Sequence, residues 1–117
     1  MTDQSRTQAR VVYEGGSVGT EIWGMTQANF LVVIPGRHAK ETAVNLTDAA
    51  ASVLAEQLGE RNTPEFRQSV AREAGVAYLE PLAAAGGHVD SVIVVSEAFL
   101  DEHPEVLARL KAAAAAA

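Results

Sequence analysis

The chain has 117 residues, enough for one domain that buries its own hydrophobic core. Its composition, 48% hydrophobic and 21% charged, is that of a globular protein, and the absence of cysteine excludes disulfides and thiolate metal sites. The net charge of −6 argues against direct nucleic-acid binding and against anionic membrane surfaces, because both need an excess of positive charge.

The first nine residues are expected to form a flexible N-terminal arm. Met1–Gln8 is polar and has no apolar run of the kind found in a secretory signal, and no later apolar stretch is long enough to cross a bilayer. We therefore expect a cytoplasmic protein, or one assembled there into a larger particle.

The segment after this arm has the pattern of β-strands. Arg10–Tyr13 predicts a short strand, and the glycine-rich Glu14–Gly19 predicts a hairpin turn. Thr20–Gln27 alternates in polarity, and Asn29–Ile34 is a continuous apolar run typical of a strand buried on both faces. These two segments form either one long strand or two parts separated by a bulge, and Pro35-Gly36 ends them.

Two helices are expected next. Thr47 or Asn45 can cap the first, whose apolar stripe begins at Leu46 and recurs at every fourth residue until Gly59 stops it. A second helix begins at Thr63-Pro64, a cap followed by proline, and is expected to end at Gly75.

The last part of the chain predicts one strand and one further helix. Val76–Pro81 is expected to be extended or to turn into Leu82–Ala85, and His88–Ser96 is rich in β-branched residues and predicts a strand. Glu97–Glu102 is at most a short helical turn before the helix that Pro104 opens. The whole is an α+β domain over residues 10–111, with one mainly antiparallel sheet, two to three helices packed on one face, and an alanine tail over residues 112–117.

No motif in the chain predicts catalysis, a metal site or a cofactor. The glycine-rich turn lacks the lysine of a phosphate-binding loop, and no Gly-x-Ser-x-Gly motif is present. The three histidines, His38, His88 and His103, are not spaced as metal ligands on a helix.

A ligand site remains an alternative. Arg37 and His38 belong to a basic cluster that follows a buried strand, and loops in that place often hold ligands. His88 and Asp90 are two residues apart on a predicted strand, so they share a face and could form an oriented histidine. These four residues define the pocket of an alternative function, a small dimeric or trimeric enzyme or a small-molecule-binding protein.

Three segments resemble known families. The strand with Gly19-Thr-Glu-Ile-Trp23, followed by the helix from Leu46 and the strand near Val89–Val95, resembles small bacteriophage head or tail structural proteins over residues 10–95. That resemblance implies a subunit repeated around a symmetric particle or tail. Leu82–Val95 is similar to the helix-to-strand crossing of the RidA-like imine deaminases, which are trimers, although Arg109 falls on a predicted helix where those enzymes need an arginine on a strand. Phe30–Gly75 resembles a helical segment of periplasmic solute receptors.

The pattern favours a non-catalytic structural subunit that assembles with copies of itself and with other assembly proteins. The expected mechanism is burial of apolar sheet surface around Trp23, Met25 and Phe30 between subunits, on a sheet face or edge that the helices leave free. The resemblance to phage proteins extends this expectation to a component of a virion.

Overall fold

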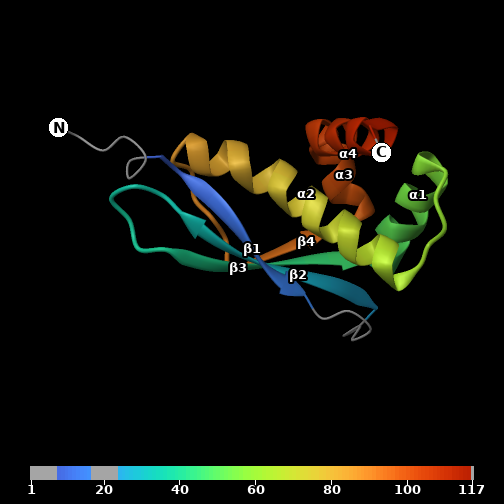
Figure 1. Cartoon of the computed structure of the whole chain (residues 1–117), viewed down its shortest axis with the longest axis horizontal. Helices are drawn as coiled ribbons and strands as arrows, with labels where there is room; N and C mark the ends of the chain where they lie inside the picture. Colours follow the sequence, from blue (N-terminus) through green and yellow to red (C-terminus); the bar gives the residue numbers. More distant parts are fainter. Residues whose placement is uncertain (1–7, 17–23, 117) are drawn as a thin grey trace.

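A computed structural model of the chain describes residues 8–16 and 24–116. Its elements are β1 (Arg10–Gly16), β2 (Met25–Val33), β3 (Lys40–Thr47), α1 (Asp48–Leu58), α2 (Pro64–Ala84), β4 (Val92–Val95), α3 (Glu97–Glu102) and α4 (Pro104–Ala116). The strands form one sheet in the order β1-β2-β3-β4; the first two neighbouring pairs are antiparallel and β3 and β4 are parallel. Figure 1 shows the helices on one side of this sheet, with α2 lying across it and α1, α3 and α4 gathered at the end away from the β2–β3 turn. The α+β fold with a mainly antiparallel sheet is therefore confirmed.

The first two strands form a bulged pair. Tyr13 lies opposite Phe30, but Gly15 lies opposite Asn29, so Glu14 is an extra residue in β1. Gly15 has a φ of 101°, which a residue with a side chain rarely adopts and which suits a bulge. Over Met25–Val33 the structure has one continuous strand, and the bulge lies in its neighbour; residues 17–23, which hold the rest of the predicted turn and strand, lie outside the described residues.

Strand β3 was not expected from the sequence, which placed a loop there and assigned Leu46 to the first helix. In the structure Thr42, Val44 and Leu46 point into the core while the residues between them face outward. Their period is therefore two, not four. The helix begins only after Thr47, whose Oγ1 accepts a hydrogen bond from the backbone N–H of Ala50 at 3.1 Å, as the predicted cap requires.

Helix α2 is longer than predicted. Thr63 caps it and Pro64 opens it, as expected, but it continues through Gly75 to Ala84. The predictions of a stop at Gly75 and of an extended Val76–Pro81 are therefore wrong. Gly75 lies where the helix crosses β2, and a Cβ at this position would overlap the ring of Phe30. The glycine allows close approach of helix and sheet instead of ending the helix.

The C-terminal elements complete the core. The strand predicted at His88–Ser96 is reduced to Val92–Val95, and the predicted helical turn Glu97–Glu102 is α3. The alanine tail belongs to α4 as far as Ala116. Beside these elements Tyr78, Phe99 and His103 pack their rings against one another, with centroids 4.5 to 5.2 Å apart, which fixes α3 and the start of α4 against α2.

Candidate functional site

The face of the sheet opposite the helices is the first candidate. We call it the uncovered face, and it consists of the residues that alternate with the core residues along each strand. Three of its valines are well exposed, Val12 at 41%, Val92 at 59% and Val94 at 44%. Further apolar members, half-buried by their neighbours, are Met25, Leu31, Val33 and Ala43.

Strand register fixes how these side chains are arranged. Val12 lies opposite Leu31 across β1 and β2, so the two form an apolar pair at one corner of the face. At the other edge Val92 and Val94 lie beside Ala43 and Asn45 of β3. The two apolar groups are thus separated by a polar centre.

That polar centre consists mainly of side-chain amides. Asn45 lies opposite Gln27, and Asn29 is two residues further along the same strand. Amides both donate and accept hydrogen bonds, so they can face water in a single copy or pair across an interface. The uncovered face therefore has the mixed chemistry of non-obligate protein interfaces, which are no more apolar than the rest of the surface.

A shallow depression of about 420 Å³ lies on this face. Ala43 and Asn29 lie among its lining residues, and Glu14 and Glu41 contribute carboxylates from β1 and β3. Arg10 lies on the same face, two residues before Val12. The face therefore carries charges of both signs, which a second copy could match with its own.

The residues predicted for an interface have different positions. Trp23 lies outside the described residues. Met25 is at the start of β2 on the uncovered face, half-buried and opposite Thr47. Phe30 is fully buried between the sheet and α2, with the ring of Tyr13 at a centroid distance of 5.5 Å. The interface position expected for Phe30 is therefore corrected to a core position, because its side chain points to the covered side of the strand.

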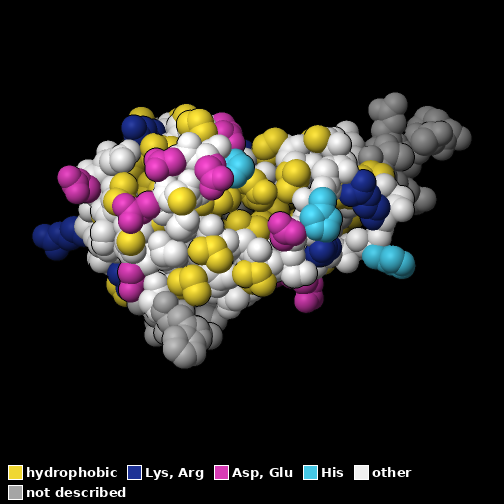
Figure 2. Space-filling model, turned by 180° about the vertical axis from the view of Figure 1, so that it is seen from behind, with side chains coloured by type: hydrophobic (Ala, Val, Ile, Leu, Met, Phe, Trp, Pro, Cys, Tyr) yellow, Lys and Arg dark blue, Asp and Glu magenta, His cyan; other side chains and the backbone are white. Residues whose placement is uncertain are grey.

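The residues of the alternative ligand site lie together in space. Arg37, His38, Lys40 and His88 line a depression of about 210 Å³ at the end of the sheet where β2 turns into β3. Figure 2 shows histidine and basic side chains gathered toward this end of the molecule, whereas acidic side chains are more frequent toward the other. Arg37 connects two loops, because its guanidinium donates to the backbone carbonyls of residues 86 and 87 at 2.7 and 3.0 Å.

His88 forms a pair with Asp90. Its Nε2 lies 3.1 Å from Asp90 Oδ1, and the two side chains are 80% and 67% exposed. A pair this exposed contributes little to stability. The backbone carbonyl of Asp90 accepts a hydrogen bond from Thr42 Oγ1 at 2.9 Å, which ties this loop to β3. Arg37 and Lys40 bring positive charge to the lining of the depression, so its chemistry suits the binding of an anion.

Sequence reasoning did not single out the exposed valines. Val92 and Val94 were inside the predicted strand, and their alternation with Ile93 and Val95 is the signal that separates outward from inward positions. Both faces of that strand are apolar, so the pattern alone does not reveal which one the helices cover.

Comparison with models of protein families, with curated proteins and with solved structures found no match. Over residues 8–16 and 24–116, no helix combines the length and apolar character that a membrane crossing requires. Within the same residues, no group of three or more histidine, aspartate or glutamate side chains could hold a metal ion.

Proposed function

We propose that the chain is a non-catalytic subunit that associates with further copies of itself through the uncovered face of its sheet. The observation that carries this proposal is the exposure of Val12, Val92 and Val94 on a face that none of the helices in residues 8–16 and 24–116 covers. Each exposed valine loses water contact when a second apolar surface packs on it, a gain of up to about 25 cal/mol per Å² of buried apolar area.

The composition of β2 supports the same proposal. Phe30 and Val32 point into the core, and Leu31 and Val33 between them point to the uncovered face. A strand with one face permanently in water normally alternates apolar and polar residues. The second half of β2 is thus apolar on both sides, which suits a sheet whose second face is also covered at this end, and the occupant here would be another copy.

The sheet edges are less suitable for self-association. β1 carries a bulge at Glu14 and charged residues at both positions 10 and 14, and β4 has only four residues. Bulges, charges and short length all reduce pairing between edge strands. We therefore assign the contact to the face of the sheet.

The area of the uncovered face determines how strong self-association through it is expected to be. Strands of four to nine residues in four rows about 4.8 Å apart give a projected area of roughly 450 Å², less than the ~800 Å² per partner of a standard interface. Association through this face alone is expected to be weak, with a dissociation constant of about 1 µM or higher.

The test is the solution mass from light scattering over protein concentrations from the micromolar to the millimolar range. Val94→Lys places a charge on the uncovered face and should shift association to at least about tenfold higher concentration. Ala108→Lys, at an exposed position of α4, makes a matched change of charge and should leave association unchanged. A monomer at every concentration, or an equal effect of both variants, would contradict the proposal.

The setting of such an assembly follows from the resemblance to small phage virion proteins over residues 10–95. We propose that repeated copies surround a symmetric particle or tail, together with other assembly proteins, and that the subunit is made in the cytoplasm. Electron microscopy of the concentrated protein tests this, since rings or tubes support it and a discrete dimer does not.

A second candidate function is binding of a small anion in the depression of Arg37, His38 and His88. The supporting observation is that two segments, the connection into the start of β3 and the one before β4, bring four basic or titratable side chains to one depression of about 210 Å³, where Arg37 is already held by two carbonyls. A carboxylate or phosphate could accept hydrogen bonds from such groups.

Thermal shift with phosphate and citrate at constant ionic strength tests this candidate. Stabilisation that is lost in Lys40→Ala and His88→Ala, and retained in Arg10→Ala on the uncovered face, would support anion binding. No stabilisation at millimolar anion would exclude it.

A further inference from the structure

A second cavity lies on the helical side of the molecule, away from the sheet. It has a volume of about 610 Å³ and is bounded by the α1–α2 connection, the first half of α2 and the end of α4. Leu58, Phe66, Val70 and Leu110 form its apolar part. Its volume falls within the ~300–1,000 Å³ of pockets that hold small organic molecules.

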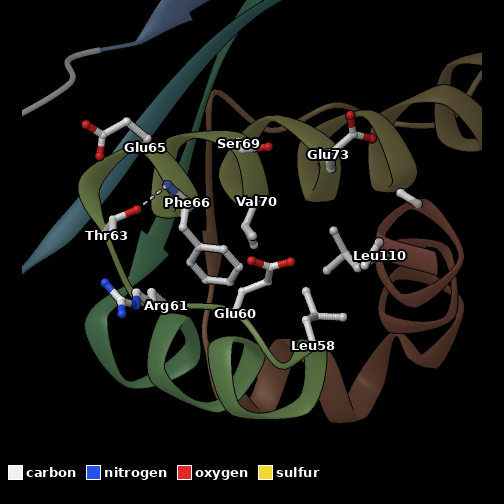
Figure 3. Close-up of a pocket in the computed structure, with 12 residues that line it drawn as sticks. Leu58, Glu60, Arg61, Thr63, Glu65, Phe66, Ser69, Val70, Glu73 and Leu110 are labelled. Atoms are coloured by element: carbon white, nitrogen blue, oxygen red, sulfur yellow. Dashed lines mark hydrogen bonds between the residues drawn. The ribbon is translucent and has the colours of Figure 1, made fainter. Parts of the chain in front are cut away.

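The charged residues of the cavity are mostly acidic. Glu60, Glu65 and Glu73 belong to its lining, against the single cation of Arg61. Among the described residues, none of these three carboxylates takes part in an ion pair. In Figure 3 the Glu60 carboxylate lies between the side chains of Val70, Leu110 and Leu58, whereas the Arg61 guanidinium points to the side. One carboxylate without an ion-pair partner among the described residues therefore lies exposed at the mouth of the cavity, beside its apolar part.

The wall that carries Glu60 is held in place. Gly59 ends α1 in the left-handed conformation, with φ 66°, and its backbone N–H is hydrogen-bonded to the last turn of the helix. Arg67 Nη1 donates to the backbone carbonyl and to Oδ1 of Asn62 at 3.2 and 3.1 Å. Thr63 Oγ1 accepts from the backbone N–H of Phe66 at 3.0 Å, drawn as the dashed line in Figure 3. Such preorganisation reduces the entropy that ligand binding costs.

We propose that this cavity binds an amphiphilic organic cation, an amine that carries an aromatic ring or a short alkyl chain. The ammonium group lies at the Glu60 carboxylate, and the apolar part packs against Phe66, Val70 and Leu110. The charge pair remains partly exposed, so it contributes modestly, and burial of the apolar part of the ligand supplies the rest of the affinity. Glu65 and Glu73 add negative potential at the rim, which attracts a cation and repels an anion.

The choice of a small cation over a peptide follows from the cavity itself. Its apolar part is formed by four large side chains and two alanines of α4 grouped in one place, whereas an amphipathic helix needs a groove with anchors spaced over several turns. The charge balance of the lining, three carboxylates and one guanidinium, excludes fatty acids and other anionic lipids as preferred ligands.

The experiment compares three probes of nearly equal size by NMR titration of the ¹⁵N-labelled protein: 2-phenylethylamine, neutral 2-phenylethanol and anionic 3-phenylpropionate. The amine should give saturable shifts of residues around Phe66, Val70 and Leu110, and the alcohol and the acid should bind more weakly, by up to about fivefold for the alcohol, as the loss of a partly exposed charge pair implies. Glu60→Gln should weaken amine binding to the level of the alcohol. Glu56→Gln, which makes the same change on an exposed part of α1 outside the cavity, should not.

Several outcomes would overturn the proposal. They are equal binding of amine and alcohol, shifts located elsewhere, equal effects of Glu60→Gln and Glu56→Gln, and no saturation by any probe up to about 10 mM, where a useful small-molecule site would be filled. Shifts caused by a basic amphipathic helical peptide but not by the amines would also overturn it, in favour of a protein partner. The same amine titration is repeated on Val94→Lys, which is expected to self-associate much less. A failure of amine binding can then be distinguished from a failure of the assembly proposal.

Discussion

The two faces of one sheet show how differently the same strands can be used. On the covered face Ala28, Phe30 and Val32 are at most 1% exposed and belong to the hydrophobic core. On the uncovered face the exposed valines lie beside amides and carboxylates, and Val92 retains 59% of its exposure. On the covered face, the shape and volume of the side chains determine how they pack. The uncovered face combines apolar, amide and charged side chains, which remain in contact with water in a single copy.

This difference separates two kinds of mutational effect. A change on the covered face alters packing within one chain and should alter the free energy of unfolding. A change on the uncovered face should alter that free energy much less and should alter association between chains. The predictions below test this separation from its strongest consequence to its weakest.

The largest effect is expected at Phe30. Phe30→Ala removes a fully buried ring and should reduce the free energy of unfolding by about 3–5 kcal/mol, measured by urea denaturation. Leu31→Ala, the adjacent residue on the uncovered face, should cost much less, about 1 kcal/mol, because Leu31 is only half-buried in one copy. Equal costs at low protein concentration would show that the two faces are not different.

A smaller effect is expected where α2 crosses the covered face. Gly75→Ala introduces a Cβ that overlaps the Phe30 ring, at a cost of about 1–3 kcal/mol for overpacking. Alanine in place of glycine returns up to about 1 kcal/mol of helix propensity. The net result should be a destabilisation of about 1–2 kcal/mol.

A double-mutant cycle identifies the cause of that loss. Phe30→Leu shortens the side chain opposite Gly75, so Gly75→Ala should be better tolerated in that background than in the wild type. Strict additivity of the two changes would show that contact with Phe30 is not what requires the glycine.

The sequence was informative where structure is determined locally. Thr47 and Thr63 were predicted as caps and serve as caps, because a cap depends on a hydrogen bond three residues away. The stop predicted at Gly75 was wrong because packing against β2, distant in sequence, overrides the low helix propensity of glycine. Strand β3 was missed for a related reason, since Leu46 fits both a helical and an alternating pattern until the strands beside it are known.

The candidate sites were predictable only in part. Arg37 and His88 were proposed as one pocket and do line one depression, but whether they bind a ligand stays a prediction. Phe30 was assigned to the wrong side of its strand. In a run that is apolar on both faces, no alternation of polar and apolar residues shows which side chains point into the core. The cavity around Glu60 was not predicted, since it is formed by the α1–α2 connection and two helices whose packing the sequence does not specify.

At the junction of the two faces, Thr47 ends β3 and caps α1. Thr47→Ala removes the hydrogen bond to Ala50 and should cost about 1 kcal/mol, measured as a lower urea midpoint with an unchanged slope. Thr47→Ser keeps the hydroxyl and should recover most of the loss. If serine were no better than alanine, the methyl group and not the cap would be responsible.

The smallest effect on a single copy is expected at Val94. Val94→Lys should change the free energy of unfolding by less than about 0.5 kcal/mol at micromolar concentration, because the side chain is 44% exposed. Association stabilises the folded state by mass action, so the melting temperature of the wild type should rise with protein concentration. In Val94→Lys this rise should be strongly reduced, whereas Ala108→Lys should retain it. A large loss of stability at low concentration would mean that Val94 supports the fold itself, and the distinction between the two faces would then fail at β4.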